Sequence, residues 1–262
     1  MVSDNYASVS PNKARPLRAD GARVKLLTGH DYCIKLPSAF LLPKHSEGAK
    51  STPVEHGFSP EELEQLTVRA KQQIRKRMRS LRTAYPEAAM LKRSESIVEQ
   101  LLQLPAYQEA TSVALFWPME GKREVDLRAL DAHARSQNKR VAYPFLRPNG
   151  ETIRTGFAEV ASVSEMSDAG RGFLEPSELA RALAHGELDL IVVPALAVTG
   201  SGHRLGYGSG FYDVTLPEFC PPARSAVVAY DFQLLMELPI IPTDVACDFV
   251  VTDKHVIVVQ QG

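Results

Sequence analysis

The chain has 262 residues, of which 44% are hydrophobic and 23% charged, a composition typical of a globular protein that buries a full core. Its formal net charge of −1 excludes the molecule-wide positive field of proteins that bind nucleic acid or anionic membranes. No run of 18 apolar residues occurs and the three cysteines, Cys33, Cys220 and Cys247, are scattered, so we expect reduced thiols, a cytoplasmic protein and no membrane partner.

Residues 1–58 differ from the rest of the chain. They contain five prolines and show neither a helical nor an alternating period, which favours a surface extension over a folded unit. Asp4 and Asp20 argue against an organelle transit peptide, which is poor in acidic residues. The apolar stretch "HDYCIKLPSAFLLP" predicts partial order that starts near Gly29.

A folded domain is predicted over residues 59–262. Ser59 is expected as the N-cap of a helix, Pro60 as its first residue and Glu62 as the partner in a capping box. Apolar residues then recur at steps of three and four, as in an amphipathic helix (Leu63, Leu66, Ala70, Ile74, Met78, Leu81). A second helix is expected to begin at Pro86 and to end before Pro105.

The remaining chain alternates short β-branched runs with helical stretches, the clearest helix being 126–137. Strands are predicted at 112–117, 140–144, 188–198, 225–230, 249–252 and 255–259. Strands that are apolar along nearly their whole length are buried on both faces. The sequence therefore predicts a three-layer, Rossmann-like α/β fold, whose largely parallel sheet has helices on both faces.

A glycine-rich loop, "GHRLGYGSGFYD" at 202–213, follows the strongest predicted strand. Gly206, Gly208 and Gly210 lack Cβ atoms, so successive backbone N–H groups can turn inward around a phosphate. Arg204, expected as an exposed loop residue, offers a permanent charge, and Asp213 offers a hard oxygen ligand for Mg²⁺. The loop predicts a nucleotide-phosphate site; the alternative is a turn with a surface arginine and an N-capping aspartate.

The stretch "RLGYGSGFYD", preceded by "DLIVVPALAV", resembles the signature of the 5-formyltetrahydrofolate cyclo-ligases, also called methenyltetrahydrofolate synthetases. The resemblance extends over about residues 60–260. "KQQIR" at 71–75 is similar to the family's Lys-x-x-x-Arg, and "VALFWPMEGKREVD" at 113–126 to its segment ending in Glu-Val-Asp. "YDFQLLMELPIIPTDVACDFVVT" at 230–252 resembles the family's closing pattern.

The resemblance implies an enzyme that converts 5-formyltetrahydrofolate to 5,10-methenyltetrahydrofolate with ATP and Mg²⁺, releasing ADP and phosphate. A formamide oxygen is a poor leaving group, so it first receives the terminal phosphoryl group; N10 then attacks the activated carbon and phosphate departs. Such chemistry requires positioning and charge neutralisation rather than a side-chain nucleophile. A reduced folate is the implied partner, with neither a nucleic acid nor a protein partner.

The family's site residues carry over position by position. Lys71 and Arg204 would be catalytic, and Asp213 and Asp244 would hold Mg²⁺. ATP would contact Lys71, Arg75, Arg204, Leu205, Gly206, Tyr207, Gly208, Ser209, Gly210, Phe211 and Tyr212. The folate would contact Trp117, Glu124, Tyr207, Gly208, Ser209, Gly210 and Phe211, with Glu124 accepting hydrogen bonds from the pterin.

Taken alone, the same residues have simpler interpretations. Lys71 and Arg75 fit a solvated basic helix face, the two aspartates fit a helix cap and a turn, and Trp117 fits the core. His203 is expected as a solvated spacer in the loop rather than a catalyst.

The chain also departs from the family pattern. Ala195, Val198 and Thr199 stand where the family has glycine, phenylalanine and aspartate; Ser209 replaces Lys or Gly; and "EGKRE" is longer than usual. A non-catalytic nucleotide- or folate-binding relative therefore stays open, as does a sugar-phosphate or CoA-handling enzyme on a similar sheet.

Overall fold

The computed structural model describes residues 59–168, 170 and 172–260, together with the backbone of residues 24–26. The partial order expected from Gly29 onward, including the apolar stretch near Cys33, lies outside the described residues.

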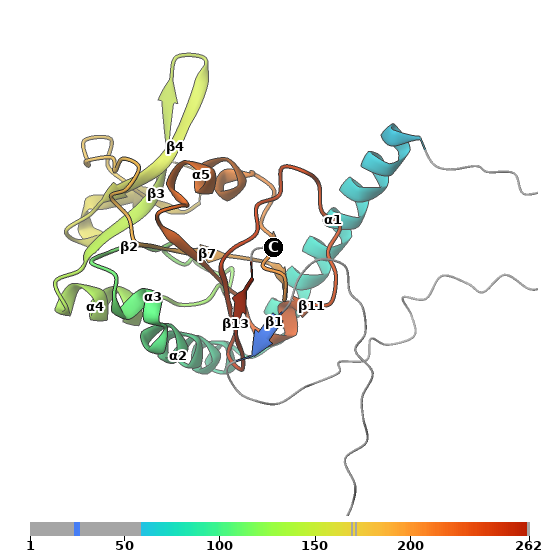
Figure 1. Ribbon diagram of the computed structural model, residues 1–262, viewed down its shortest axis with the longest axis horizontal. Coiled ribbons are helices and arrows are strands. Elements are labelled where there is room, and N and C mark those ends of the chain that lie inside the picture. Colours follow the sequence, from blue (N-terminus) through green and yellow to red (C-terminus); the bar gives the residue numbers. More distant parts are fainter. Residues whose placement is uncertain (1–23, 27–58, 169, 171, 261–262) are drawn as a thin grey trace, which may run out of the picture.

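An eight-stranded mixed sheet forms the centre of the molecule (Figure 1), in the order β1-β13-β12-β10-β7-β2-β3-β4. Neighbours from β12 to β3 are parallel, whereas β13 and β4 run antiparallel to the strands beside them. The strands are β1 Val24–Leu26, β2 Ser112–Ala114, β3 Arg140–Asn149, β4 Thr152–Glu159, β7 Leu190–Pro194, β10 Arg224–Val228, β12 Phe249–Val251 and β13 Val256–Val259. The predicted largely parallel sheet is confirmed.

Helices cover both faces of this sheet, because side chains of each strand alternate between two apolar cores. In β7, Leu190 and Val192 pack in the core beneath α2, α3 and α4, whereas Ile191 and Val193 pack in the core beneath α5. The helices are α2 Glu87–Gln103, α3 Pro105–Gln108, α4 Arg128–Ser136 and α5 Phe211–Phe219. The predicted three-layer α/β class is therefore confirmed.

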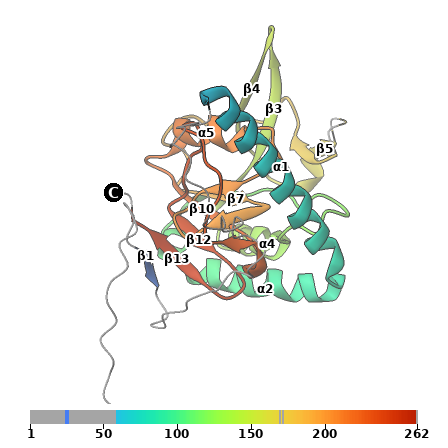
Figure 2. The ribbon, with the colours of Figure 1, turned by 90° about the vertical axis from the view of Figure 1, so that its right-hand side faces the viewer.

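Helix α1, Pro60–Ala84, lies apart from these layers, and its first turns project from the body (Figures 1 and 2). The predicted capping box is confirmed: Ser59 Oγ accepts the Glu62 N–H at 3.2 Å, and Glu62 Oε2 accepts the Ser59 N–H at 2.8 Å. Met78 is buried, but Leu63 and Leu66 are 51% and 44% exposed. The apolar stripe is thus buried only in its second half.

That second half of α1 packs on a small sheet formed by β11 (Leu234–Leu235), β8 (Ala197–Thr199) and β9 (Arg204–Leu205). Met78 contacts a core that includes Leu196, Ala197 and Leu205. The predicted strand at 188–198 is therefore divided into β7 and β8, which belong to different sheets. This packing brings one side of α1 against the glycine-rich loop that follows β9.

The remaining elements are peripheral to that contact. A ribbon of β5 (Met166–Asp168) and β6 (Leu174–Pro176) follows the 3-10 turn Val163–Glu165, and a second 3-10 turn spans Asp231–Gln233. Cys220 and Cys247 are free thiols, as predicted. Among the described helices, none combines the length and apolarity needed to span a bilayer.

Strand β1 corrects one expectation about the N-terminal extension. Residues Val24–Leu26 pair antiparallel with β13 at the edge of the main sheet. We expected no ordered element before Gly29, which is wrong for these three residues. A strand of three residues is too short to show an alternating pattern in the sequence.

Candidate functional site

Three loops meet at the carboxyl ends of the parallel strands. Trp117 and Glu124 follow β2, the glycine-rich loop follows β7 by way of β8 and β9, and Tyr230 follows β10. In open α/β sheets ligands bind at this edge, where the strand ends leave a crevice. Two cavities lie here; Tyr207 lines one of them and Glu124 lines the other.

The first, called the glycine-loop cavity, has a volume of about 600 Å³. It is formed by one side of α1, by the loop and the start of α5, and by the segment before β12. It brings together every residue predicted for ATP or metal: Lys71, Arg75, Arg204, Leu205, Gly206, Tyr207, Gly208, Ser209, Gly210, Phe211, Tyr212, Asp213 and Asp244.

Backbone geometry explains the glycines in this loop. Gly208 and Gly210 have φ angles of 117° and 71°, in the left-handed region that side chains other than glycine rarely adopt. A Cβ atom at Gly206 or Gly210 would meet no atom within 4 Å, so open space lies beside the backbone. Gly210 is also the N-cap residue of α5, whose first N–H groups carry partial positive charge. The loop therefore has the shape and polarity of a phosphate cradle.

Arg75 contacts this cradle from α1. Its Nε donates to the Gly206 carbonyl oxygen at 2.9 Å, and its guanidinium carbon would lie 3.6 Å from a Cβ atom on Gly208. Burial lowers the pKa of Arg75, and the charge of Arg79 adds to the decrease. An arginine remains charged at neutral pH even so.

Each predicted metal ligand in the cavity is paired with a cation. Lys71 Nζ donates to Asp244 Oδ2 at 2.6 Å, and Arg204 Nη2 donates to Asp213 Oδ1 at 2.9 Å. Asp244 Oδ2 also accepts the Ile241 N–H at 2.8 Å. Lys71 is largely buried by its ion pair, with 12% of its side chain exposed, which does not fit the alternative of a solvated helix face.

The position of Arg204 differs from the expectation of an exposed loop arginine. It lies in strand β9 with 3% of its side chain exposed, and it donates to the Val245 carbonyl oxygen as well as to Asp213. A buried charge must be paired and hydrogen-bonded, so packing against 245–247 explains its burial. Asp213 is not the N-cap of α5, because Gly210 occupies that position.

The chemistry of the donor set fits Mg²⁺ held jointly by protein and nucleotide. Asp213 and Asp244 are two hard oxygen donors in one cavity, and Mg²⁺ in such sites takes one or two carboxylates plus phosphates and water. Within the described part of the chain, no group of three or more His, Cys, Asp or Glu side chains is arranged as a metal site. The protein alone thus offers an incomplete ligand set that phosphate oxygens would complete.

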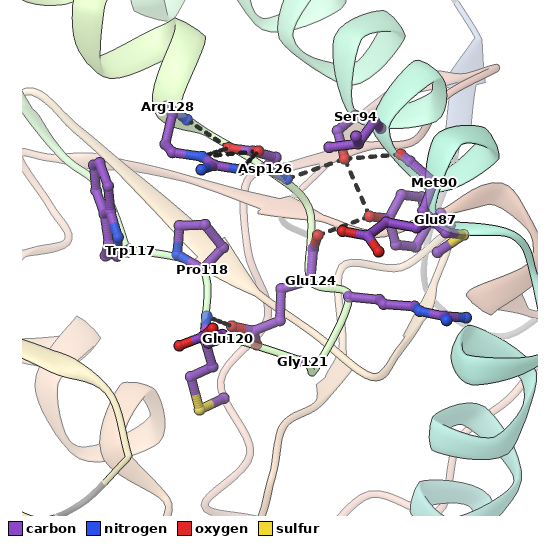
Figure 3. A pocket seen from close by; sticks show the side chains of 14 residues that line it. Glu87, Met90, Ser94, Trp117, Pro118, Glu120, Gly121, Glu124, Asp126 and Arg128 are labelled. Carbon is purple, nitrogen blue, oxygen red and sulfur yellow. Dashed lines mark hydrogen bonds and ion pairs between the residues drawn. The ribbon is translucent and has the colours of Figure 1, made fainter.

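The second cavity, called the Trp117 cavity, has a volume of about 540 Å³. Figure 3 shows Trp117 and Pro118 on one side and Met90 and Ser94 of α2 on the other. Glu124 also lines it and is 7% exposed. The Trp117 ring packs edge-on against Tyr143, with 6.2 Å between ring centroids. Trp117 is therefore both half-buried and accessible from the cavity.

Glu124 is nearly fully buried. Its Oε2 accepts the Met119 N–H at 2.9 Å. Burial raises the pKa of Glu124, and the Met119 hydrogen bond, the charge of Arg82 and a hydrogen bond from Tyr207 partly offset that increase. A carboxylate held this way keeps lone pairs for N–H donors entering the cavity.

Tyr207 connects the two cavities. Tyr207 lines the glycine-loop cavity, and its hydroxyl accepts a hydrogen bond from Arg82 Nη1 at 2.9 Å. Glu124, which lines the other cavity, is near enough that the two groups shift each other's pKa. Arg82, which is only 2% exposed, was not among the residues predicted from the sequence. Its signal was present, because Arg82 lies four residues after Met78, on the side of α1 that packs inward.

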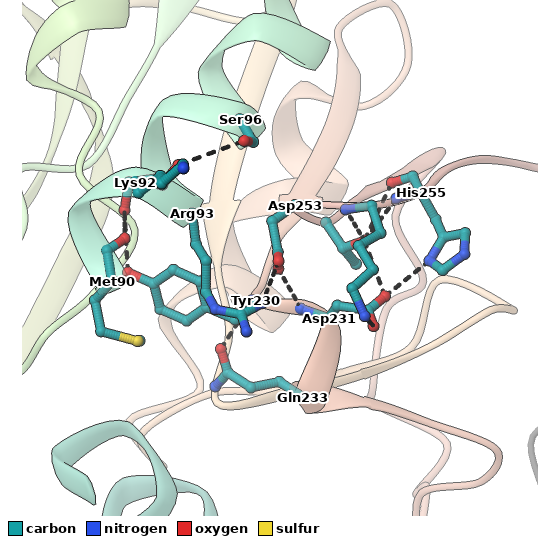
Figure 4. A network of polar contacts seen from close by, with 12 residues as sticks. Met90, Lys92, Arg93, Ser96, Tyr230, Asp231, Gln233, Asp253 and His255 are labelled. Carbon is teal, nitrogen blue, oxygen red and sulfur yellow. Dashed lines mark hydrogen bonds and ion pairs between the residues drawn. The ribbon is translucent and has the colours of Figure 1, made fainter. Parts of the chain in front are cut away.

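A polar network around Tyr230, Asp231 and Gln233 adjoins the Trp117 cavity, which Tyr230 lines (Figure 4). The Tyr230 hydroxyl donates to the Glu124 carbonyl oxygen at 2.8 Å, and the Tyr230 N–H donates to Gln233 at 3.0 Å. Gln233 in turn donates to the Leu196 carbonyl oxygen at 2.6 Å. The Asp231 N–H donates to Asp253 at 2.6 Å. The segments after β2, β7 and β10 are thereby hydrogen-bonded to one another.

The departures from the family pattern have structural explanations. Thr199 Oγ1 bonds to Ser201 Oγ at 2.9 Å. This position therefore carries a hydrogen-bonded neutral hydroxyl where the family has a charged aspartate. Ser201 also contacts His203, whose Nδ1 lies 3.2 Å from Ser201 Oγ. In the longer segment at 120–124, Arg123 has a φ of 49° and donates to carbonyl oxygens at the end of α1. The extra length is accommodated by capping that helix.

The chain was compared with known families and proteins. The sequence model of the 5-formyltetrahydrofolate cyclo-ligase family matches residues 67–253. The 5-formyltetrahydrofolate cyclo-ligase of Escherichia coli is 30% identical over 187 residues, which cover 70% of this chain and 98% of that protein. The namesake from Mycolicibacterium smegmatis is 52% identical over 73 residues, which cover 28% of this chain and 38% of that relative.

A solved structure shows the same fold. The 5,10-methenyltetrahydrofolate synthetase of Aquifex aeolicus superposes with a TM-score of 0.61 and 31% identity, covering 71% of this chain and 91% of that protein. The region outside these matches is mainly the N-terminal part of the chain, since the family match begins at residue 67.

Proposed function

Since the chain belongs to the 5-formyltetrahydrofolate cyclo-ligase family, we propose that it converts 5-formyltetrahydrofolate to 5,10-methenyltetrahydrofolate, consuming ATP with Mg²⁺ and releasing ADP and phosphate. The observation that carries the proposal is a pair of cavities at one edge of the sheet, one lined by Tyr207 and the other by Glu124, its electrostatic neighbour. One is lined by cations and a glycine cradle and the other by Trp117 and a buried carboxylate. ATP, which donates the phosphoryl group, and the folate, which receives it, would thus lie side by side.

The glycine-loop cavity would hold the nucleotide. Lys71 and Arg75 present two cations from one side of α1, and the loop offers backbone N–H groups between them and α5. Mg²⁺ bound by Asp213 and Asp244 would neutralise phosphate charge. Lys71 and Asp244 neutralise each other at 2.6 Å, so we expect both to exchange partners, Lys71 toward phosphate and Asp244 toward the metal. Arg204 would act by holding Asp213 and the 245–247 segment in place.

The Trp117 cavity would hold the pterin end of the folate. Glu124 would accept hydrogen bonds from the pterin amino and ring N–H groups, and Trp117 would cover the apolar face of the ring. The formamide oxygen would receive the terminal phosphoryl group at the boundary between the cavities. N10 would then attack the activated carbon, and phosphate would leave. We also propose a reducing, cytoplasmic setting, which suits the free thiols of Cys220 and Cys247.

The test is to incubate the full chain with 5-formyltetrahydrofolate and to follow the absorbance of the methenyl product, with and without Mg-ATP. We expect product only when Mg²⁺ and ATP are both present, and one ADP per product. Lys71→Met should lose most of the activity, whereas the matched control Lys254→Met, in an exposed turn, should keep it.

Two outcomes would contradict the proposal and favour an alternative. Binding of folate or ATP by calorimetry without turnover would indicate a non-catalytic relative. Binding of neither compound would favour a sugar-phosphate or CoA-handling enzyme.

A further inference from the structure

We propose that Arg82, acting with Tyr207 and Arg123, is a positioning residue. It holds Glu124, the side chain proposed to bind the folate, from the nucleotide side of the site. The inference rests on the proposed function and deepens it. It assigns a role to the buried cation Arg82, which contacts Tyr207 of the glycine-loop cavity and Arg123 of the Trp117 cavity, and it accounts for the longer loop at 120–124.

Arg82 is shared between two loops. Its Nη1 donates to the Tyr207 hydroxyl at 2.9 Å, and its Nε donates to the Arg123 carbonyl oxygen at 3.1 Å. Only 2% of the residue is exposed. A buried guanidinium with fixed acceptors restrains those acceptors, because losing either bond leaves a desolvated charge unsatisfied.

Arg123 in turn donates hydrogen bonds to the end of helix α1. Its Nη1 donates to the Arg82 carbonyl oxygen at 3.3 Å and also to the carbonyl oxygens of Thr83 and Tyr85. The last carbonyls of a helix have no partners within it, so a cation there is favourable. Arg123 adopts a positive φ of 49°, which is uncommon for a non-glycine residue and directs the chain back toward Glu124. The loop is therefore fastened to the end of α1 one residue before Glu124.

Tyr207 completes the connection. Its hydroxyl accepts a hydrogen bond from the Arg82 guanidinium at 2.9 Å, and it lies near enough to the Glu124 carboxylate that each group shifts the pKa of the other. The groups that face Glu124 are Arg82 from α1, Tyr207 from the glycine-rich loop and Lys122 from its own loop, with Tyr212 and Tyr230 within electrostatic range. The carboxylate is thus oriented by a residue whose backbone belongs to the phosphate cradle.

The arrangement would couple the two substrates. Movement of the loop around a nucleotide would move Tyr207 and thereby Glu124, and by linkage each ligand would change the affinity for the other by the same factor. The Tyr207→Phe variant removes only the hydroxyl. It keeps the ring that packs near Ile74 and Leu205.

The experiment compares Tyr207→Phe with wild type by calorimetry and by turnover. Tyr107→Phe is the matched control, because Tyr107 is buried and its hydroxyl bonds to His133 at 2.8 Å, outside both cavities. We expect Tyr207→Phe to weaken binding of 5-formyltetrahydrofolate to the free protein about tenfold, to raise its KM similarly and to leave the ATP affinity of the free protein within about twofold. The acidic limb of kcat/KM for the folate should move to higher pH, since a hydrogen bond that favours ionised Glu124 is lost.

Several outcomes would overturn the inference. Unchanged folate affinity and an unchanged pH profile in Tyr207→Phe would mean that the contacts only stabilise the fold. Equal losses in Tyr107→Phe and Tyr207→Phe would mean the same. Arg82→Lys, if it folds, should reproduce the folate defect, and normal folate binding by this variant would also contradict us. Failure of the proposed function is distinguishable, because wild type itself would then neither bind nor convert the folate.

Discussion

Arg204 and Asp213 form an ion pair of 2.9 Å that also encloses the peptide groups of Val245. Arg204 donates to the Val245 carbonyl oxygen, and Asp213 Oδ1 accepts the Val245 N–H at 3.2 Å. The pair therefore joins β9, α5 and the segment before β12. Arg204 holds the wall of the glycine-loop cavity rather than projecting into solvent.

This burial predicts that Arg204→Ala lowers stability. Removing one partner of a fully buried ion pair costs about 3–5 kcal/mol. Asp213 is 30% exposed and can regain water, so we expect a smaller loss here, to which the lost donor of the Val245 carbonyl oxygen adds. Urea unfolding should detect the loss. Arg75→Ala is the comparison, because Arg75 is half-buried and contacts the loop through one hydrogen bond. It should change stability little but weaken ATP binding about tenfold or more. A stable Arg204→Ala protein would contradict the structural role.

The Lys71–Asp244 pair predicts opposite effects of one substitution with and without metal. In Asp244→Asn, Lys71 loses its carboxylate partner and becomes available for phosphate. ATP binding in the presence of a chelator should therefore tighten, while turnover at ordinary Mg²⁺ should collapse and recover only partly with excess metal. Calorimetry in both conditions and a Mg²⁺ titration of turnover check this. Normal turnover at low Mg²⁺ would mean that Asp244 is not a metal ligand.

The raised pKa of Glu124 predicts a pH dependence of folate binding. An acid whose folded pKa lies above its ordinary value of 4.5 becomes protonated, and loses its charge, at a higher pH than an exposed glutamate. kcat/KM for the folate should then fall as pH drops through that raised pKa. Glu124→Gln should remove this limb and lower kcat/KM by about 10- to 100-fold at neutral pH. The ATP affinity of the free protein serves as the control and should not change.

Asp231 predicts a pH dependence of stability. Burial alone would raise its pKa, but hydrogen bonds from Lys254 and His255, together with their charges, lower it below 3.8. A lowered folded pKa stabilises the protein above the ordinary value, and this contribution is lost as pH falls through the folded pKa. Asp231→Asn should therefore lose about 1 kcal/mol at pH 7. The difference from wild type should shrink below pH 3.8, and a constant difference would contradict the assignment.

Much of the fold was predictable because the local signals agree with the tertiary structure. The capping box at Ser59 and the apolar runs that became β7, β10, β12 and β13 are strong signals of this kind. The division between β7 and β8 was not predictable, since both are apolar and only their different sheets distinguish them. The exposure of the first half of α1 was also not predicted, because an apolar stripe on a helix does not show which part of it is packed against other elements.

The residues of the candidate site were named by resemblance, but their pairings were not. Nothing in the sequence indicates that Asp244 lies 2.6 Å from Lys71, because 173 residues separate them. The same holds for Arg82 and Tyr207, which lie 125 residues apart. Arg204 was expected in solvent because glycines surround it, whereas its burial depends on a segment some 40 residues later. Long-range contacts of this kind arise from packing, which a local pattern does not encode.

The length of α1 between its two sets of contacts has a consequence for sequence change. Lys71 and Arg75 line the glycine-loop cavity, and Arg82 contacts Tyr207 and Arg123. An α-helix turns by about 100° and rises about 1.5 Å per residue. Arg82 lies eleven positions after Lys71, which amounts to about three turns and about 16 Å, so all three cations emerge on the same side. A single inserted or deleted residue between Arg75 and Arg82 would rotate the Arg82 side chain by about 100° away from Tyr207. The register of α1 therefore fixes both sets of contacts at once. An insertion between Lys71 and Arg82 would separate them, whereas an insertion before Lys71 would not.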